Sequence, residues 1–222
     1  MCGRYSLTTP EEALVGLFEA GPLEGHAPRF NAAPAQTLPV VRLDSDGARQ
    51  WAWLRWGLVP SWAKDPAIGN RMINARAETV AEKPSFRAAF RRRRCLVIAD
   101  GFYEWQARDG AKQPYHIALA DGGPMAFAGL WERWDGDATL ETFTILTTEA
   151  SPDIAPIHHR MPVILAPAHY SVWLGAEDAG LLAGLLVPGG GVELVARAVS
   201  RHVNNPRHDD ADCLASEDQL PR

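Results

Sequence analysis

The chain has 222 residues, of which 46% are hydrophobic, with 22 lysines and arginines against 27 aspartates and glutamates. This length and composition suit one compact globular domain and exclude a disordered or fibrous chain. The formal net charge of −5 excludes nucleic-acid binding through bulk positive charge, so any such site must be a local basic patch.

The three cysteines, Cys2, Cys95 and Cys213, are widely spaced and form no CxxC pair. We therefore expect free thiols, with neither a disulfide framework nor a bound metal. The chain contains no apolar run of the roughly 20 residues that span a bilayer, and its start lacks the apolar stretch of a secretory signal. The expectation is a soluble, cytoplasmic protein without membrane contact.

The first element expected along the chain is a helix. Thr9 is suited to the N-cap, Pro10 to the first helical position, and Glu12 to the third position of a capping box. The apolar stripe of this helix is formed by Leu14, Val15, Leu17 and Phe18.

Beyond Gly21 the pattern changes to strands. Residues 38–43 and 50–58 flank a DSDG turn, which predicts a hairpin. Apolar and β-branched runs predict further strands at 95–99, 115–120, 125–130, 142–147, 161–165 and 192–199. Helices are expected near 84–92, 167–174 and 176–186.

Strands joined mainly by turns, with helices inserted at intervals, favour an α+β fold. We expect a single domain over residues 2–205, with a strongly curved, largely antiparallel, barrel-like sheet and flanking helices. The acidic, weakly periodic segment at 206–222 is predicted to be a solvated C-terminal tail.

Cys2 has unusual chemistry if Met1 is removed, because one residue then carries a free amine and a thiol. Their reference pKa values, about 7.7–8.0 and about 8.5, leave each a reactive fraction near pH 7. An aldehyde can form a Schiff base with the amine and then a thiazolidine with the thiol. Considered alone, Cys2 is more typical of an incidental residue in a disordered terminus.

Three polar clusters in apolar surroundings, at 74–78, 100–105 and 156–162, indicate a site. Glu104 follows an apolar strand between Tyr103 and Trp105, where burial would raise its pKa toward the range useful for proton transfer. A solvent-exposed carboxylate is the alternative.

His158 and His159 precede a predicted strand and could move protons to a sugar hydroxyl or an imine. A capping or core histidine is equally consistent with either position. Trp62 lies in a proline-bounded, irregular segment, where its ring could stack on an unpaired base or simply belong to the core.

Arginines within apolar stretches indicate recognition of phosphate or carboxylate groups, and Arg4, Arg76 and Arg160 fit this description. An ion pair with Glu78 is the competing interpretation for Arg76. The run at 91–94 is the densest basic patch and could contact phosphates, although a solvated face is the commoner role of such a run.

Taken in order, several motifs between residue 2 and about residue 205 resemble those of the SOS response-associated peptidase (SRAP) family. They are MCGRY at the start, RFNAAP (29–34), WGLVPSW (56–62), INARAET (73–79), ADGFYEW (99–105), PIHHRMP (156–162) and VSRHVNN (199–205). The resemblance implies a protein that shields abasic sites in single-stranded DNA, including single-strand/double-strand junctions, through a thiazolidine crosslink.

By this resemblance, Cys2 forms the crosslink and Asn74 positions it. Glu104 transfers protons during imine formation, and His158 assists sugar ring opening and crosslink reversal. The resemblance implies a monomer without cofactor or metal, which acts on DNA in the nucleoid with lyase-like Schiff-base chemistry.

The same resemblance assigns Arg4 and Arg76 to the phosphates beside the abasic site, and Asn31, Pro34 and Trp62 to the DNA path. Two positions depart from the family pattern. His159 stands where the family often has Asp, and Ala63 where some members have a second Trp.

Two other functions remain open. The first is a cysteine peptidase, limited to removing its own leader, in which the Cys2 thiol attacks a peptide carbonyl beside Glu104 and His158. The second is a non-covalent DNA-binding module, which the net charge of −5 disfavours.

Overall fold

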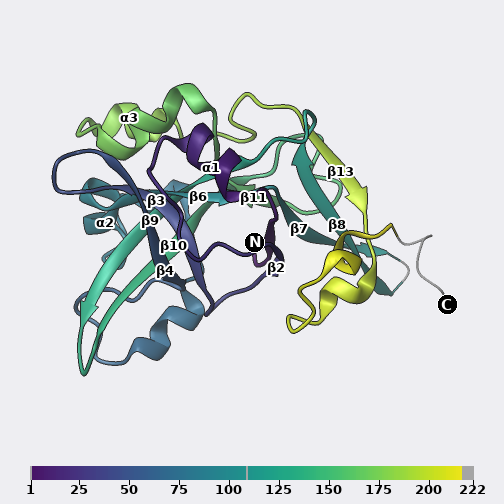
Figure 1. Ribbon diagram of the computed structural model, residues 1–222, viewed down its shortest axis with the longest axis horizontal. Helices are drawn as coiled ribbons and strands as arrows, with labels where there is room; N and C mark the ends of the chain where they lie inside the picture. The colour runs from purple at the N-terminus through teal and green to yellow at the C-terminus, as the bar shows by residue number, and fades with distance from the viewer. Residues whose placement is uncertain (1, 109, 217–222) are drawn as a thin grey trace.

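The computed structural model describes residues 2–108 and 110–216 (Figure 1). The strands are β1 (Tyr5–Leu7), β2 (Arg29–Ala32), β3 (Thr37–Leu43), β4 (Arg49–Trp56), β5 (Asn74–Arg76), β6 (Arg94–Ala99), β7 (Gly101–Arg108), β8 (Ala111–Leu119), β9 (Met125–Asp135), β10 (Thr139–Glu149), β11 (Arg160–Pro162), β12 (Ile164–Leu165) and β13 (Leu194–Ala198). The α-helices are α1 (Glu11–Phe18), α2 (Arg87–Arg92), α3 (Tyr170–Gly175) and α4 (Ala179–Gly184). Short 3-10 helices are η1 (Pro66–Arg71), η2 (Ala77–Thr79), η3 (Pro167–His169), η4 (Arg201–Asn204) and η5 (Ala211–Leu214). Among these described residues, none of the helices has the length and apolar character needed to cross a membrane.

Strands β3, β4, β6, β9 and β10 close into a barrel, which lies below α3 in Figure 1. Neighbouring strands run β9, β10, β4, β3 and β6, and β6 pairs with β9 to complete the ring. The pairings are antiparallel except that of β4 with β10, which is parallel. The predicted α+β class with a curved, largely antiparallel, barrel-like sheet is confirmed.

A second sheet lies beside the barrel, with its strands in the order β13, β8, β7, β1 and β2. β1 pairs antiparallel with β7 on one edge and with β2 on the other, so that Tyr5 lies opposite both Phe102 and Ala32. Because both edges of β1 are hydrogen-bonded, the segment that begins at Cys2 enters the fold at a defined position.

Aromatic side chains join the two sheets. The ring centroid of Tyr5 lies 5.3 Å from that of Trp56 and 6.3 Å from that of Phe127. Phe102 meets Phe127 at 5.9 Å, and Trp56 stacks on Phe143 at 6.0 Å. All five side chains are buried, and each such pair contributes about 0.5–1.5 kcal/mol beyond the burial of its area. This cluster holds the N-terminal strand against the barrel.

Asp100, between β6 and β7, ties the start of the chain to the barrel. Its carboxylate accepts hydrogen bonds from the main-chain N–H groups and the hydroxyls of Thr8 and Thr9, at 2.5 to 3.1 Å. Helix α1 begins at Glu11 after Pro10, without a side-chain cap. The predicted capping box at Thr9 is therefore wrong, because the Thr9 hydroxyl donates its hydrogen bond to the carboxylate of Asp100, 91 residues away.

Most of the predicted strands are confirmed. The hairpin is β3 with β4, paired from Thr37–Arg55 to Leu43–Arg49. The other predicted strands correspond to β6, β8, β9, β10, β11 with β12, and β13, and the later helical stretches contain α2, α3 and α4. The sequence pattern does not predict β1, β2 and β5, which have only three or four residues, or β7, in which aromatic and polar residues mix without alternation.

The acidic C-terminal segment packs against β2 instead of extending into solvent. The Asp209 carboxylate accepts hydrogen bonds from the main-chain N–H groups of Phe30 and Asn31, at 2.6 and 2.8 Å. The prediction of a solvated tail is therefore wrong for residues 206–216, because the Asp209 carboxylate satisfies donors on β2 and Cys213 is buried. Residues 217–222 lie outside the described residues.

Half of the basic run at 91–94 serves the fold. Arg93 forms an ion pair with Glu132 at 2.6 Å. Arg94 is buried, and its guanidinium donates to main-chain carbonyls at the ends of α2 and α3, namely those of Phe90, Arg91, Trp173, Leu174 and Ala176. Only the exposed Arg91 and Arg92 remain available as a surface patch.

We expect Arg94→Leu to lower the free energy of unfolding by about 2–4 kcal/mol, because it leaves buried helix-end carbonyls without donors. Urea unfolding followed by circular dichroism measures the change. Arg92→Leu, at an exposed position in the same run, should change the stability by less than about 0.5 kcal/mol. Equal losses in the two variants would contradict the structural role of Arg94.

Candidate active site

Cys2 lies just before β1 and is completely buried. Its thiol faces the carbonyl oxygen of Arg4, with Sγ 3.9 Å from that atom. Burial, and then the negative charge of Glu104, raise the pKa of the Cys2 thiol, which therefore stays protonated near neutral pH. Cys2 thus belongs to the folded core of the molecule, in contrast to the disordered terminus that its sequence position alone favours.

Glu104 lies on β7, the strand that pairs with β1, and is 3% exposed. The N–H of Tyr103 donates to the carbonyl of Arg4 at 3.0 Å, so the same register places Glu104 across from Gly3. Removal from water raises the pKa of Glu104 to about 7. Its protonated and ionised forms are then both populated near neutral pH, which suits a group that donates and accepts protons.

His158 approaches Glu104 from the segment before β11. Its Nδ1 lies 3.8 Å from Oε1 of Glu104 and 3.0 Å from the main-chain nitrogen of Arg160. Burial lowers the pKa of His158, which favours the neutral ring. His159 is exposed, with its ring centroid 4.5 Å from that of His158. Of the two predicted histidines, His158 is therefore the one that faces the buried carboxyl.

Strand β10 brings the two remaining motifs together. Near its end, β5 pairs with one edge and β11 with the other, so Asn74 and Arg160 come from segments flanking the same strand. Arg160 donates two hydrogen bonds to Glu78, at 2.5 and 3.0 Å, and one to the carbonyl of Thr147. Glu78, the partner considered for Arg76, is thus engaged by Arg160, and Arg76 is exposed.

The side-chain amide of Asn74 is buried. Among the described residues, neither its oxygen nor its nitrogen has a hydrogen-bond partner. An unsatisfied buried polar group costs about 1–3 kcal/mol, and a bound ligand that completes its hydrogen bonds would offset this cost. Asn74 is therefore a candidate ligand contact at the barrel end.

Asn31 and Arg4 form a supporting network behind the site. Arg4 donates to the side-chain oxygen of Asn31 at 2.9 Å and to the carbonyl of Val203 at 3.0 Å. The Asn31 amide nitrogen donates to the carbonyls of Val203, Asn205 and His208. Asn31 is completely buried, and its hydrogen-bonding groups are used within the protein. That it lines a DNA path stays a prediction, and in this structure its role is to support the sheet that leads to Cys2.

An open cleft of about 510 Å³ lies at the end of β10. Arg76, His159 and Arg160 line it and supply positive or titratable groups, while Glu149 supplies a negative one. The cleft therefore joins residues of the INAR and HHRMP motifs on one surface. It offers a path for a negatively charged ligand past the histidine pair.

Trp62 and Pro34 lie apart from this cleft. Trp62 is 58% exposed and lines a separate depression with Lys64 and Arg71. Pro34 is half-buried in the turn after β2, where the next residue, Ala35, has a φ of 69°, the left-handed conformation that alanine rarely adopts. The exposed ring of Trp62 is consistent with the predicted stacking on a base.

The sequence patterns do not predict the hydrogen-bond partners of two supporting residues, Asp100 and Asp209. Asp100 belongs to the polar cluster at 100–105, but its partner Thr9 is 91 residues away. Asp209 binds Phe30 across 179 residues. No local pattern predicts contacts over such separations.

The fold and the site define a class of protein, in which a closed barrel carries a second sheet and a buried N-terminal cysteine beside a glutamate–histidine pair. The chain belongs to the SOS response-associated peptidase (SRAP) family, whose model matches residues 1–206. The predicted family is thereby confirmed.

Similar proteins cover the chain almost completely. The abasic site processing protein YoaM of Bacillus subtilis is 40% identical over an alignment 228 residues long, which covers 99% of this chain and 100% of YoaM. The abasic site processing protein HMCES of Gallus gallus is 32% identical over 85% of this chain and 66% of its own length. A solved structure of a Bacteroides thetaiotaomicron protein superposes with a TM-score of 0.85 at 27% identity, covering 97% of this chain and 99% of that one.

We expect Glu104→Gln to stabilise the protein above neutral pH. The pKa of Glu104 is about 7 in the folded state and near 4.5 when unfolded, so between these values the folded state binds more protons. Stability is therefore lost as pH rises through this window, by up to about 3 kcal/mol. Urea unfolding at about pH 5 and about pH 8 should show wild type losing stability relative to Glu104→Gln.

The exposed Glu82 supplies the matched control for this measurement, because Glu82→Gln removes a carboxyl that is already in water. Its stability should follow that of wild type at both pH values. If the stability of Glu104→Gln also follows that of wild type at both pH values, the fold does not raise the pKa of the Glu104 carboxyl.

Proposed function

We propose that this protein processes abasic sites in single-stranded DNA by bonding covalently, through Cys2, to the aldehyde of the ring-opened sugar. The observation that carries the proposal is the burial of Cys2 in the field of Glu104, whose carboxyl lies 3.8 Å from His158. The names of the relatives, abasic site processing proteins, support the choice of lesion. The resulting crosslink would shield the lesion, including at single-strand/double-strand junctions.

The reaction begins at the amine of Cys2, which removal of Met1 exposes. The nitrogen attacks the aldehyde carbon, and the carbinolamine loses its hydroxyl as water to give an imine. The adjacent thiol sulfur then adds to the imine carbon while its proton reaches the imine nitrogen. The products are one thiazolidine and one water, and no redox partner is needed.

Glu104 suits the proton transfers in both steps. Its carboxylate takes a proton from the attacking amine, and its acid form protonates the departing hydroxyl. With a pKa of about 7, the same carboxyl serves both roles near neutral pH. Because the pKa of the Cys2 thiol is raised, the thiol adds after the imine has formed, as its proton is passed on.

His158 and Asn74 act on the sugar in this proposal. A neutral imidazole can move the proton of the sugar hydroxyl when the ring opens, and reverse the transfer when the crosslink is undone. The buried amide of Asn74, which has no hydrogen-bond partner in the part of the chain that the structure describes, suits a hydrogen bond to the sugar or to the Cys2 amine. Both residues would therefore position the reacting groups around the aldehyde.

The phosphates would follow the cleft that Arg76 and Arg160 line, and Arg4, two residues after Cys2, would lie beside the lesion while it bonds to Asn31 and Val203. Trp62 would stack on a base away from the lesion. Few basic contacts are available in a chain with a net charge of −5, so non-covalent affinity would be low. A covalent bond is the feature that compensates for this.

The peptidase alternative fits the site less well. A cysteine peptidase attacks with a thiolate, and burial together with Glu104 disfavours the thiolate of Cys2. The neutral His158, whose Nδ1 faces the main chain of Arg160, also differs from the imidazolium that pairs with such a thiolate. A reaction with an aldehyde that starts at the Cys2 amine needs neither a thiolate nor an imidazolium.

We expect the mature protein to give a species stable to denaturing electrophoresis when mixed with single-stranded DNA that carries one abasic site. Cys2→Ala should abolish it, because the thiazolidine needs the thiol. Cys95→Ala, which alters a buried thiol in the barrel, should retain it. Intact mass should show that the reactive protein lacks Met1, and equal crosslinking by wild type and Cys2→Ala would refute the mechanism.

We expect Glu104→Gln to slow crosslink formation by about 10²-fold or more, because the amide cannot transfer protons. In wild type the pH profile of the rate should show an inflection near pH 7 as the Glu104 carboxylate forms. This inflection should disappear in the variant, which keeps only the rise caused by deprotonation of the Cys2 amine. Rapid-quench gel analysis across pH measures both. A wild-type pH profile retained by Glu104→Gln would exclude Glu104 from proton transfer.

A further inference from the structure

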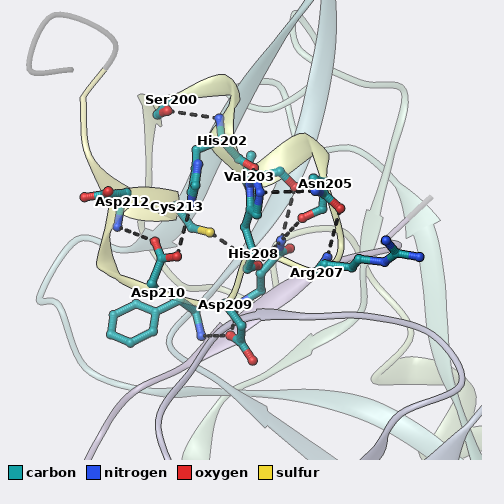
Figure 2. Close-up of polar contacts among 12 residues, drawn as sticks. Ser200, His202, Val203, Asn205, Arg207, His208, Asp209, Asp210, Asp212 and Cys213 are labelled. Atoms are coloured by element: carbon teal, nitrogen blue, oxygen red, sulfur yellow. Dashed lines mark hydrogen bonds and ion pairs between the residues drawn. The ribbon is translucent and has the colours of Figure 1, made fainter. Parts of the chain in front are cut away.

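The C-terminal segment brings three side chains of metal-binding type together. His202 on η4, Asp210 before η5 and Cys213 on η5 place their donor atoms within 4.8 Å of one another. Figure 2 shows the Cys213 sulfur and the Asp210 carboxylate beside the His202 ring. We propose that these three residues bind one Zn²⁺ ion, a site distinct from Cys2 and Glu104.

The donor set selects the metal. An imidazole nitrogen, a carboxylate oxygen and a thiolate sulfur together suit Zn²⁺, whereas Mg²⁺ and Ca²⁺ take oxygen ligands. Donors on one tetrahedral zinc lie roughly 3.3–3.8 Å apart, given metal–ligand bonds of about 2.0–2.3 Å. The His202 Nε2 and Asp210 Oδ2 atoms are 3.1 Å apart. The Cys213 sulfur lies within 4.8 Å of both residues' donor atoms, so closing the site around zinc needs a movement of at most about 1–1.5 Å.

Burial and charge around the cluster favour a cation. Cys213 is buried, His202 is half-buried and Asp210 is exposed, so an ion could enter from solvent past the carboxylate. The carboxylates of Asp209 and Asp212 add negative charge near Cys213, and Asp209 also pairs with Arg29. This negative charge favours the approach of a dication.

The surrounding contacts also hold the ligands in place. The His202 main-chain N–H donates to Ser200 Oγ at 3.0 Å, and the His202 ring stacks on that of His208 with centroids 3.8 Å apart. The Cys213 thiol donates to the His208 carbonyl at 3.6 Å, and its proton would pass to solvent when zinc binds. Three protein ligands leave the fourth position to water.

The site would connect the two ends of the loop that supports the N-terminal sheet. The carbonyls of Val203 on η4, and of Asn205 and His208 between η4 and η5, accept the hydrogen bonds of Asn31. Zinc would join His202 and Cys213 across this loop and so hold these carbonyls in place. The expected effect is a higher melting temperature of the full chain, independent of any reaction at Cys2.

Zn²⁺ retention after gel filtration, measured by elemental analysis of the full chain, tests the proposal. We expect one Zn²⁺ per chain in wild type. Cys213→Ser and His202→Gln should each weaken Zn²⁺ affinity by more than about tenfold and remove the zinc-dependent rise in melting temperature. Loading with Co²⁺ should give a thiolate-to-cobalt charge-transfer band that requires Cys213.

Cys2→Ala and Cys95→Ala are the matched controls, because each removes another buried thiol and leaves the cluster intact. Both should keep the zinc and the cobalt band. His202→Gln keeps the Cys213 thiol, so loss of zinc from a variant with wild-type circular dichroism would not reflect unfolding. The proposal is overturned if wild type retains no Zn²⁺, or if Cys213→Ser and His202→Gln retain it as well as wild type.

Discussion

The structure depends on the double-sided pairing of β1. This strand has only three residues, yet β7 and β2 hydrogen-bond to its two edges and Tyr5 packs into the aromatic cluster of the barrel. Asp100 holds the residues that follow it. A chain start would otherwise fray. Because these contacts fix β1, Cys2, three residues before it, is held in a buried position in the field of Glu104.

The same burial gives the site its electrostatic character. Glu104 is removed from water beside the barrel, which raises its pKa to about 7 and makes its ionised form unfavourable for the fold. The amide of Asn74 is buried without a partner among the described residues. Both features oppose stability, and both would serve the proposed reaction with a sugar aldehyde. Under that proposal, stability and function are in conflict at this end of the barrel.

The two ends of the chain support each other. Arg4 and Asn31, near the start, bond to carbonyls of the segment between Val203 and His208, and Asp209 bonds to the main chain of β2. An ordered C-terminal segment thus backs the sheet that positions Cys2. A zinc ion at His202, Asp210 and Cys213 would strengthen this support without entering the reaction.

Much of the fold follows from local patterns, since the hairpin at 38–58 and the apolar strands at 95–99 and 142–147 carry their own alternation or apolar runs. The family motifs likewise indicated Glu104 and His158, which the fold brings to within 3.8 Å of each other.

The residue types available for the chemistry, and the elements whose hydrophobic period is local, therefore follow from the sequence. The partners of Thr9, Asn31 and Arg94 follow only from the packed fold, because these hydrogen bonds join segments about 80 to 180 residues apart. No short-range pattern encodes such contacts. The same limit applies to the pKa of Glu104, since burial is a property of the packed fold.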